Sequence, residues 1–213
     1  MGKTAMLVGA TGLVGGILLK RLLADPRYDK IVVVCRKTAW REGGKLIVRE
    51  GDFSRLEELT ADLTVDDVYC ALGSTRKKAG SKAAFVNVDY EYPLQLAQLA
   101  LKKGAKRFLL VSSAGASAKS RFFYLRTKGA LEDALAKLSF EMLVIARPSL
   151  LLGKRSEFRL GEWLLLRINR FLPLAWRGVE AQQVAVSLIE AANSGRGGCK
   201  VITAAQLRRI ETR

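Results

Sequence analysis

Residues 5–15, AMLVGATGLVG, join an apolar run to a glycine-rich turn at the start of the chain. A helical pattern of apolar residues follows over residues 13–23. Strand, glycine turn and helix in this order are typical of a dinucleotide-binding fold, because glycines let the backbone approach a pyrophosphate and the helix N-terminus supplies free N–H groups. The spacing G-x-x-G-x-x-G indicates a particular branch of that fold, since many dehydrogenases have G-x-G-x-x-G. We predict that this turn binds a cofactor, with a tight turn that binds nothing as the alternative; its candidate residues are Gly9, Thr11, Gly12, Leu13, Val14 and Gly15.

Apolar and β-branched runs recur along the chain and predict strands at residues 4–9, 31–35, 46–48, 67–71, 107–111, 142–146 and 200–202. Helical periodicity lies between several of them, over residues 83–103, 125–138 and 181–193. This alternation predicts an α/β fold, a doubly wound parallel sheet of the Rossmann type. Because the chain has 213 residues and no linker or internal repeat, we expect a single domain over 1–213, with residues 150–180 as a small C-terminal substrate region.

The composition excludes several kinds of chemistry. The chain contains no histidine, which excludes Ser-His-Asp hydrolysis, Cys-His catalysis and histidine-based metal sites. Its net charge of +16 attracts phosphate-bearing ligands. The lysines and arginines are scattered and form no nucleic-acid motif, so a solvated basic surface is favoured over nucleic-acid binding. We see no secretory signal and no apolar run of the ~20 residues that a transmembrane span needs, which favours a cytoplasmic protein.

The residues after the second predicted strand indicate the coenzyme. NAD-binding folds place an acidic residue about 20 positions past the glycines, where it binds the ribose 2′-hydroxyl. Arg36 and Lys37 stand in this region instead. A guanidinium can pair with a 2′-phosphate through charge-assisted hydrogen bonds. We therefore predict NADP(H) as the cofactor, with a solvent-facing arginine as the alternative.

Other strand ends supply further candidate contacts of the cofactor. Asp52 and Phe53 follow the third strand, where the carboxylate and the ring could meet an adenine. Asp52 could instead cap the helix that starts at Ser54, and both roles are compatible. After the fourth strand, Ala71-Leu72-Gly73 lets the backbone pass close to a cofactor. Ser112 follows the fifth strand. Pro148, after the sixth, lacks an N–H and can bound a nicotinamide pocket or simply end the strand.

Tyr124 and Lys128 form the pattern Tyr-x-x-x-Lys, and Ser113 precedes them at the end of the fifth strand. Residues four apart lie on one face of a helix. Since a nearby cation favours the ionised form of a phenol, Tyr124 can give a proton to a developing alkoxide or take one from an alcohol. Ser113 would bind the substrate oxygen. Tyr124 and Lys128 are also candidate contacts of the cofactor, and Lys128 would hold the nicotinamide ribose. This order of motifs predicts reduction of a carbonyl group.

Further motifs occur in order, namely LGSTRKKAG at 72–80, FFYLRTKG at 122–129, Arg147-Pro148 and Gly161-Glu162-Trp163. Residues 4–190 thus resemble the short-chain dehydrogenase/reductase superfamily, in its atypical NAD(P)H-binding branch, and within it the Tat-interacting-protein-like subgroup. The resemblance implies a Rossmann domain in which Ser113, Tyr124 and Lys128 are catalytic and an asparagine, here Asn87, supports them. Leu160 departs from the subgroup, which tends to have proline there.

We therefore expect an NADPH-dependent reductase of a small carbonyl compound, with Tyr124 as general acid. Arg155, Arg159 and Trp163 are candidate substrate contacts, and an acidic substrate would fit the charge of the two arginines. The resemblance also implies an alternative, because founding members of the subgroup are discussed as regulators. In that alternative, NADPH occupancy governs the binding of a protein partner and no metabolic turnover occurs.

Overall fold

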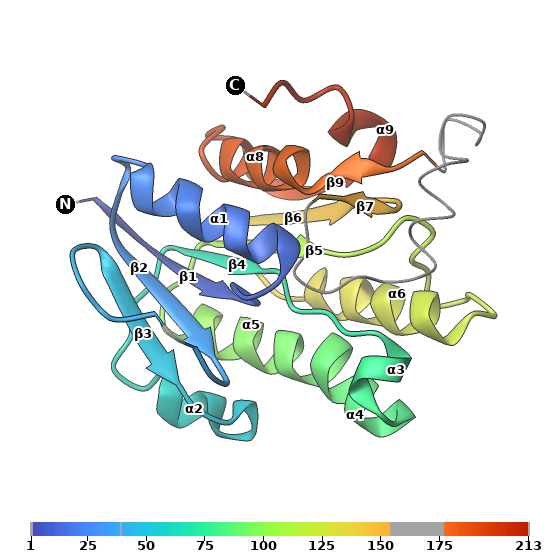
Figure 1. Cartoon of the computed structure of the whole chain (residues 1–213), viewed down its shortest axis with the longest axis horizontal. Coiled ribbons are helices and arrows are strands. Elements are labelled where there is room, and N and C mark those ends of the chain that lie inside the picture. Colours follow the sequence, from blue (N-terminus) through green and yellow to red (C-terminus); the bar gives the residue numbers. More distant parts are fainter. Residues whose placement is uncertain (1, 39, 154–176, 213) are drawn as a thin grey trace.

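The computed structural model describes residues 2–38, 40–153 and 177–212, which form a seven-stranded sheet (Figure 1). The strands are β1 (Lys3–Val8), β2 (Tyr28–Cys35), β3 (Leu46–Glu50), β4 (Asp67–Cys70), β5 (Arg107–Val111), β6 (Met142–Arg147) and β9 (Gly198–Thr203). Their order across the sheet is β3-β2-β1-β4-β5-β6-β9, and every neighbouring pair is parallel. The predicted α/β fold with a doubly wound parallel sheet is confirmed.

Helices cover both faces of the sheet, as Figure 1 shows. On one face α1 (Leu13–Ala24) packs beside α8 (Ala181–Ala192), and on the other α5 (Tyr92–Lys102) packs beside α6 (Phe123–Leu135). The shorter helical segments are a 3₁₀ turn (Phe53–Arg55), α2 (Leu56–Leu59), α3 (Arg76–Ala79), α4 (Lys82–Val86), a π turn (Asn87–Glu91) and α9 (Ala204–Leu207).

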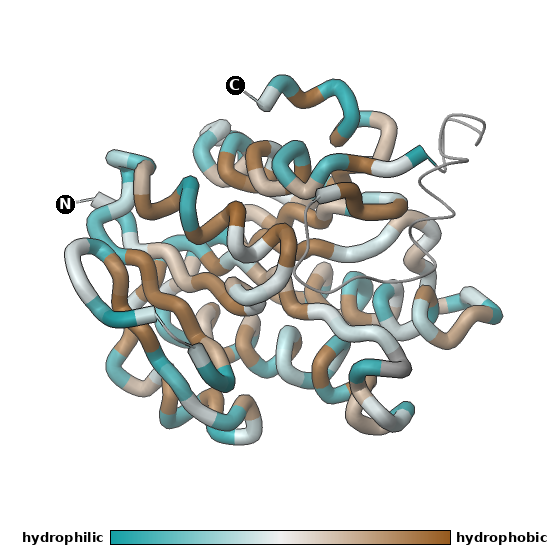
Figure 2. Tube along the Cα trace, viewed as in Figure 1, coloured by the Kyte–Doolittle hydropathy of each residue, from teal (hydrophilic) through white to brown (hydrophobic). Residues whose placement is uncertain are grey.

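The core lies in two layers, because successive side chains of a strand point to opposite faces. In β1, Ala5 and Leu7 join the layer under α1 and α8, whereas Met6 and Val8 join the layer under α5 and α6. Figure 2 shows the hydrophobic residues concentrated along the strands and on the helix sides that face them. Strands buried on both faces are apolar throughout, which is the pattern that made them predictable.

The predicted helix over 83–103 is interrupted. The π turn Asn87–Glu91 separates α4 from α5. A π turn holds more residues than an α turn, so it shifts the directions of the side chains around it. Asp89 is consequently buried, and Asn87 is exposed.

A second difference concerns the expected substrate region, residues 150–180. Among the described residues, two short strands that the sequence did not indicate, β7 (Leu151–Leu152) and β8 (Val179–Glu180), pair in a small parallel sheet. The Ser149 hydroxyl also donates a hydrogen bond to the Arg177 carbonyl. Residues 154–176, the middle of this region, lie outside the described residues.

A buried polar cluster joins β2, β4 and β5 near the amino ends of the strands. The Tyr28 hydroxyl donates to Asp67 at 2.5 Å and lies 2.8 Å from the Tyr69 hydroxyl. Arg107 pairs with the other oxygen of Asp67. Burial, helped by the Asp67 carboxylate, raises the pKa of Tyr28, and burial also raises the pKa of Tyr69. This cluster lies at the opposite end of the sheet from the glycine turn, so we assign it a structural role.

We expect the stability of the protein to fall as the pH rises above about 10. An unfolded chain releases the Tyr28 proton there, whereas the folded chain keeps it, so the free energy of unfolding decreases with pH. Tyr28→Phe should remove about 1.4 kcal/mol per pH unit from this slope. Urea unfolding on both sides of pH 10 measures it, with Tyr90→Phe as the control. An unchanged slope in Tyr28→Phe would contradict the assignment.

Candidate active site

Two glycines bring the first helix against the ends of two strands. Gly9 follows β1 with a φ of +80°, a conformation that suits glycine. A side chain there would overlap the carbonyl group of Ala71, just after β4. A side chain on Gly15 would overlap the carbonyl group of Gly9. No side chain caps the N-terminus of α1 at Gly12, so N–H groups of the first turn are left for a ligand.

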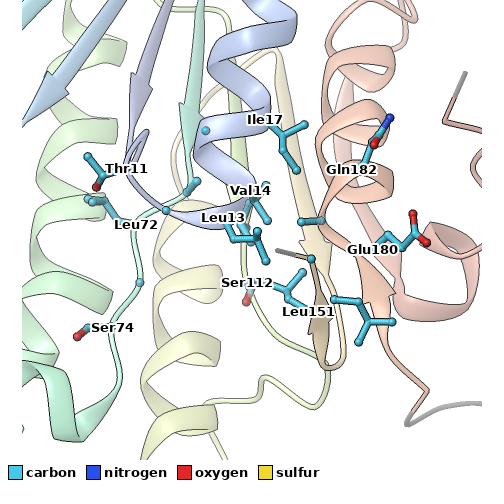
Figure 3. Close-up of a pocket in the computed structure, with 18 of the residues that line it drawn as sticks. Thr11, Leu13, Val14, Ile17, Leu72, Ser74, Ser112, Leu151, Glu180 and Gln182 are labelled. Atoms are coloured by element: carbon cyan, nitrogen blue, oxygen red, sulfur yellow. The ribbon is translucent and has the colours of Figure 1, made fainter. Parts of the chain in front are cut away.

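A cavity of about 940 Å³ opens beyond the carboxyl ends of the central strands (Figure 3). This volume is in the range of small-molecule and cofactor sites. The glycine turn, the chain after β4 and the Tyr–Lys pair of α6 all line this cavity. Its lining among the described residues also includes Leu151, Leu152, Gly153 and Glu180, which belong to the expected substrate region 150–180, and Ser74 and Lys78, which belong to the motif at 72–80. The lining positions that the sequence did not indicate are Gly16, Ile17, Val111, Ala181 and Gln182.

Tyr124 and Lys128 lie one turn apart on α6, as the sequence predicts, and both line the cavity. Tyr124 is 41% exposed, and the centre of its ring lies 5.9 Å from that of Phe85. Lys128 is only 2% exposed, and its Nζ lies 3.5 Å from the Leu72 carbonyl oxygen. The phenol is therefore open to a ligand, while the ammonium stands behind it in the protein.

Lys128 has a buried partner, Asp89, that the sequence analysis did not identify. The two side chains form an ion pair in which Lys128 Nζ lies 2.9 Å from Asp89 Oδ1. Burial lowers the pKa of Lys128, but attraction to Asp89 and Tyr124 outweighs it, so the pKa lies above its ordinary value. Lys128 therefore remains a cation at neutral pH. A signal was present in the sequence, because Asp89 lies four residues after Phe85 on the face predicted to be apolar.

Of the two serines that follow β5, Ser112 lines the cavity among the described residues and Ser113 does not. The Ser112 hydroxyl donates to Glu132 on α6, and both carboxylate oxygens of Glu132 lie 3.1 Å from Arg147 Nε. Ser113 is half-buried, and its hydroxyl donates to the Ala114 carbonyl at 3.3 Å. The structure thus brings the predicted cofactor contact Ser112 to the cavity but does not place the predicted catalytic Ser113 in its wall.

A second cavity, of about 560 Å³, lies beyond β2 and β3 and includes Arg36, Asp52 and Asn87 in its wall. Asn87 therefore does not accompany Tyr124 and Lys128, because the π turn directs Asp89 to Lys128 instead. Asn87 was predicted to support Tyr124 and Lys128, but the structure places it in the wall of the second cavity, and Asp89 contacts Lys128 instead. The Asp52 carboxylate accepts from the Ser54 N–H at 2.9 Å, so the alternative reading of Asp52 as a cap applies.

The other predicted contacts have different surroundings. Phe53 is 4% exposed and packs edge-on against Tyr92 at 5.7 Å, which leaves its ring no open face for a base. Lys37 is exposed. Pro148 is buried, and its carbonyl accepts from the Ala114 N–H at 2.8 Å. The predicted substrate contacts lie outside the described residues; they are Arg155, Arg159 and Trp163.

Residues 5–159 match the NAD dependent epimerase/dehydratase family. The chain belongs to this family. It is 39% identical to Protein HTATIP2 of Rattus norvegicus over 178 residues, which are 82% of this chain and 73% of that protein. It is 36% identical to Protein FMP52, mitochondrial, of Candida albicans over 206 residues, 92% of this chain and 90% of that protein. The Bordetella bronchiseptica enzyme WbmG in complex with NAD has the same fold, with a TM-score of 0.73 and 18% identity over 95% of this chain and 73% of that chain. The resemblance predicted from the motifs is confirmed.

The predicted cytoplasmic location is wrong. The fungal relatives from Candida albicans and Saccharomyces cerevisiae, each 36% identical to this chain, are named as mitochondrial proteins. The prediction was based on the absence of a recognisable secretory signal and of a transmembrane run. Such an absence does not distinguish one compartment from another. Within the described residues, no helix has both the length and the hydropathy to cross a membrane.

We expect Gly15→Ala to destabilise the glycine turn and Gly16→Ala to leave it intact. The methyl group at residue 15 would overlap backbone, and overpacking of this kind costs about 1–3 kcal/mol. The methyl group at residue 16 would lie 3.4 Å from the Ala10 carbonyl oxygen, and alanine improves a helix by about 0.5–1 kcal/mol. Urea unfolding of the two variants makes the comparison. Equal free energies of unfolding would contradict the close packing at Gly15.

Proposed function

We propose that this protein is an NADPH-dependent oxidoreductase that reduces a small carbonyl compound, with Tyr124 as general acid. The observation that carries the proposal is that Tyr124 and Lys128 line the same cavity as the glycine turn. Membership of an NAD dependent family supports a nicotinamide cofactor. A Tyr–Lys pair beside such a cofactor has the groups that a carbonyl reduction needs.

The residues present fit such a cofactor. The uncapped N-terminus of α1 would hold the diphosphate, and the cavity beside Arg36 would hold the adenosine end. Lys128 would bind the nicotinamide ribose. Gly73, which also lines the cavity, lies next to this lysine, since a Cβ there would be 3.7 Å from Lys128 Nζ. When bound, NADPH would supply the hydride.

The protein would supply the proton. The Tyr124 hydroxyl would donate its proton to the substrate oxygen as negative charge develops there, and such positioned proton transfer contributes about 10²–10⁴-fold. Lys128 stays cationic beside the phenol, which favours the phenolate left by the transfer. Ser113 is not among the described lining residues of this cavity, and its hydroxyl donates to the Ala114 carbonyl at 3.3 Å, so the proposed proton transfer rests on Tyr124 and Lys128.

Arg36 supports NADP(H) over NAD. It is exposed, follows β2 and lines the second cavity. Glu50 and Asp52 also line that cavity, where their carboxylates accept from the Thr38 N–H at 3.0 Å and the Ser54 N–H at 2.9 Å. Arg36 is the cation among the described residues of this lining. Arg36 is thus the group there that would pair with a 2′-phosphate.

The choice of coenzyme is tested by thermal shift. NADP at 100 times its dissociation constant should add about 2.7 kcal/mol, and therefore raise the melting temperature by roughly 5–11 °C. NAD at the same concentration should give a smaller shift. Arg36→Ala should remove the difference between the two coenzymes, whereas Lys30→Ala, at the other end of the same strand, should keep it. An equal or greater shift with NAD on the unchanged protein would overturn the preference.

Turnover is tested with a panel of small aldehydes and ketones, by the loss of NADPH absorbance. Tyr124→Phe should lower kcat by about 10²–10⁴-fold and leave the affinity for NADPH nearly unchanged, because only the proton donor is lost. Tyr90→Phe is the control. Binding of NADPH without oxidation by any compound of the panel would overturn the reductase and favour the cofactor-sensing alternative.

A further inference from the structure

Asp89, in the π turn, contacts two other segments of the site, α6 and the chain after β4. Its Oδ1 lies 2.9 Å from Lys128 Nζ on α6, and its Oδ2 accepts a hydrogen bond from the Ser74 N–H at 2.8 Å. Ser74 belongs to the chain after β4, which lines the cavity. Lys128 Nζ also lies 3.5 Å from the Leu72 carbonyl of that chain. One carboxylate therefore holds both the ammonium and the cavity wall beside it.

The backbone is locally unusual where Asp89 lies. The helix is interrupted there by the π turn Asn87–Glu91, and π turns occur frequently at functional sites. An uninterrupted α-helix would direct its side chains differently from this point on. Asp89 therefore points toward Lys128 from within this irregular turn.

The groups around Lys128 explain why it needs a carboxylate. Lys128 and Asp89 are 2% and 0% exposed, so water cannot stabilise the charge of either. The titratable groups that act on Lys128 are Asp89 from the π turn, Tyr124 from α6 and Cys70 from β4. Burial raises the pKa of Cys70 to about 11, so this thiol is neutral at physiological pH. Asp89 is therefore the anion among these groups that balances Lys128.

We propose that Asp89 is a positioning residue, which fixes the charged Lys128 and the Leu72–Ser74 segment for catalysis. This inference rests on the proposed reductase function. Asp89 would not touch the substrate. It keeps the ammonium protonated and in place behind Tyr124, and it holds the wall against which the nicotinamide ribose would lie.

The first test measures the protonation of Lys128 directly. Nuclear magnetic resonance of protein labelled with carbon-13 at lysine Cε follows each lysine through a pH titration, and Lys128→Arg assigns the signal of Lys128. We expect the unchanged protein to give a pKa above the ordinary lysine value of about 10.4. Asp89→Asn should give a pKa below it, because burial remains and the attraction is lost.

Asp67→Asn is a matched control. Asp67 is also 0% exposed and paired with a cation, Arg107, but it lies at the amino end of β4. Both variants lose a buried ion pair and should lose stability. Asp67→Asn should leave the pKa of Lys128 unchanged, so a general effect of lower stability is separated from a local effect at Lys128.

The second test measures turnover with the best carbonyl compound of the panel. Asp89→Asn should lower kcat by about 100-fold, since small misplacements of catalytic groups have effects of this size. Asp67→Asn should keep the kcat of the unchanged protein. Equal losses of kcat in the two variants, or an unchanged pKa of Lys128 in Asp89→Asn, would overturn the role of Asp89.

Two further outcomes are decisive. If the unchanged protein reduces no carbonyl compound, the proposed function fails, and the titration alone decides whether Asp89 holds the charge of Lys128. If Asp89→Asn does not fold, the titration of the unchanged protein decides. A Lys128 pKa at or below the ordinary lysine value would then overturn the proposal.

Discussion

The backbone of Gly9 lies so close to the Ala71 carbonyl that no side chain fits between them. This contact sets the ends of β1 and β4 and the first turn of α1 at one point, beside which the cavity of about 940 Å³ opens. Since parallel strands end on the same edge of a sheet, the chain after β4, the end of β5 and the exposed face of α6 reach this point as well. At the opposite edge, Asp67 and Tyr28 hold the amino ends of the strands together. The carboxyl ends of the strands therefore hold the candidate site, and the amino ends hold a cluster to which we assign a structural role.

Most of the fold could be predicted from the sequence because its central strands, β1, β2, β4, β5 and β6, are largely buried on both faces. Such strands read as unbroken apolar runs, as in Ile31–Cys35 and Met142–Ala146. The π turn could not be predicted, because apolar periodicity assumes a constant 3.6 residues per turn. The pairing of Leu151–Leu152 with Val179–Glu180 was missed for another reason. Strands of two residues contain no pattern, and their pairing depends on contacts between distant parts of the chain.

The candidate site was predictable where spacing alone decides geometry. Tyr124 and Lys128 share one helix, so their common face follows from their separation. Spacing does not decide where Ser113 and Asn87 point, because the direction of a side chain at a strand end or in a π turn depends on the surrounding packing. The structure places Ser112 in the cavity wall and directs Asp89, not Asn87, to Lys128. Asp89 could have been identified from the sequence, because it is an acidic residue on a helix face that is otherwise apolar.

A crystal structure of the protein grown with saturating NADPH tests the central claim most directly. We expect the diphosphate against the N–H groups at the start of α1, the 2′-phosphate beside Arg36, and the nicotinamide ring in front of Tyr124 and Lys128. A coenzyme bound away from the glycine turn, or a Tyr124 hydroxyl directed away from the nicotinamide, would contradict the account.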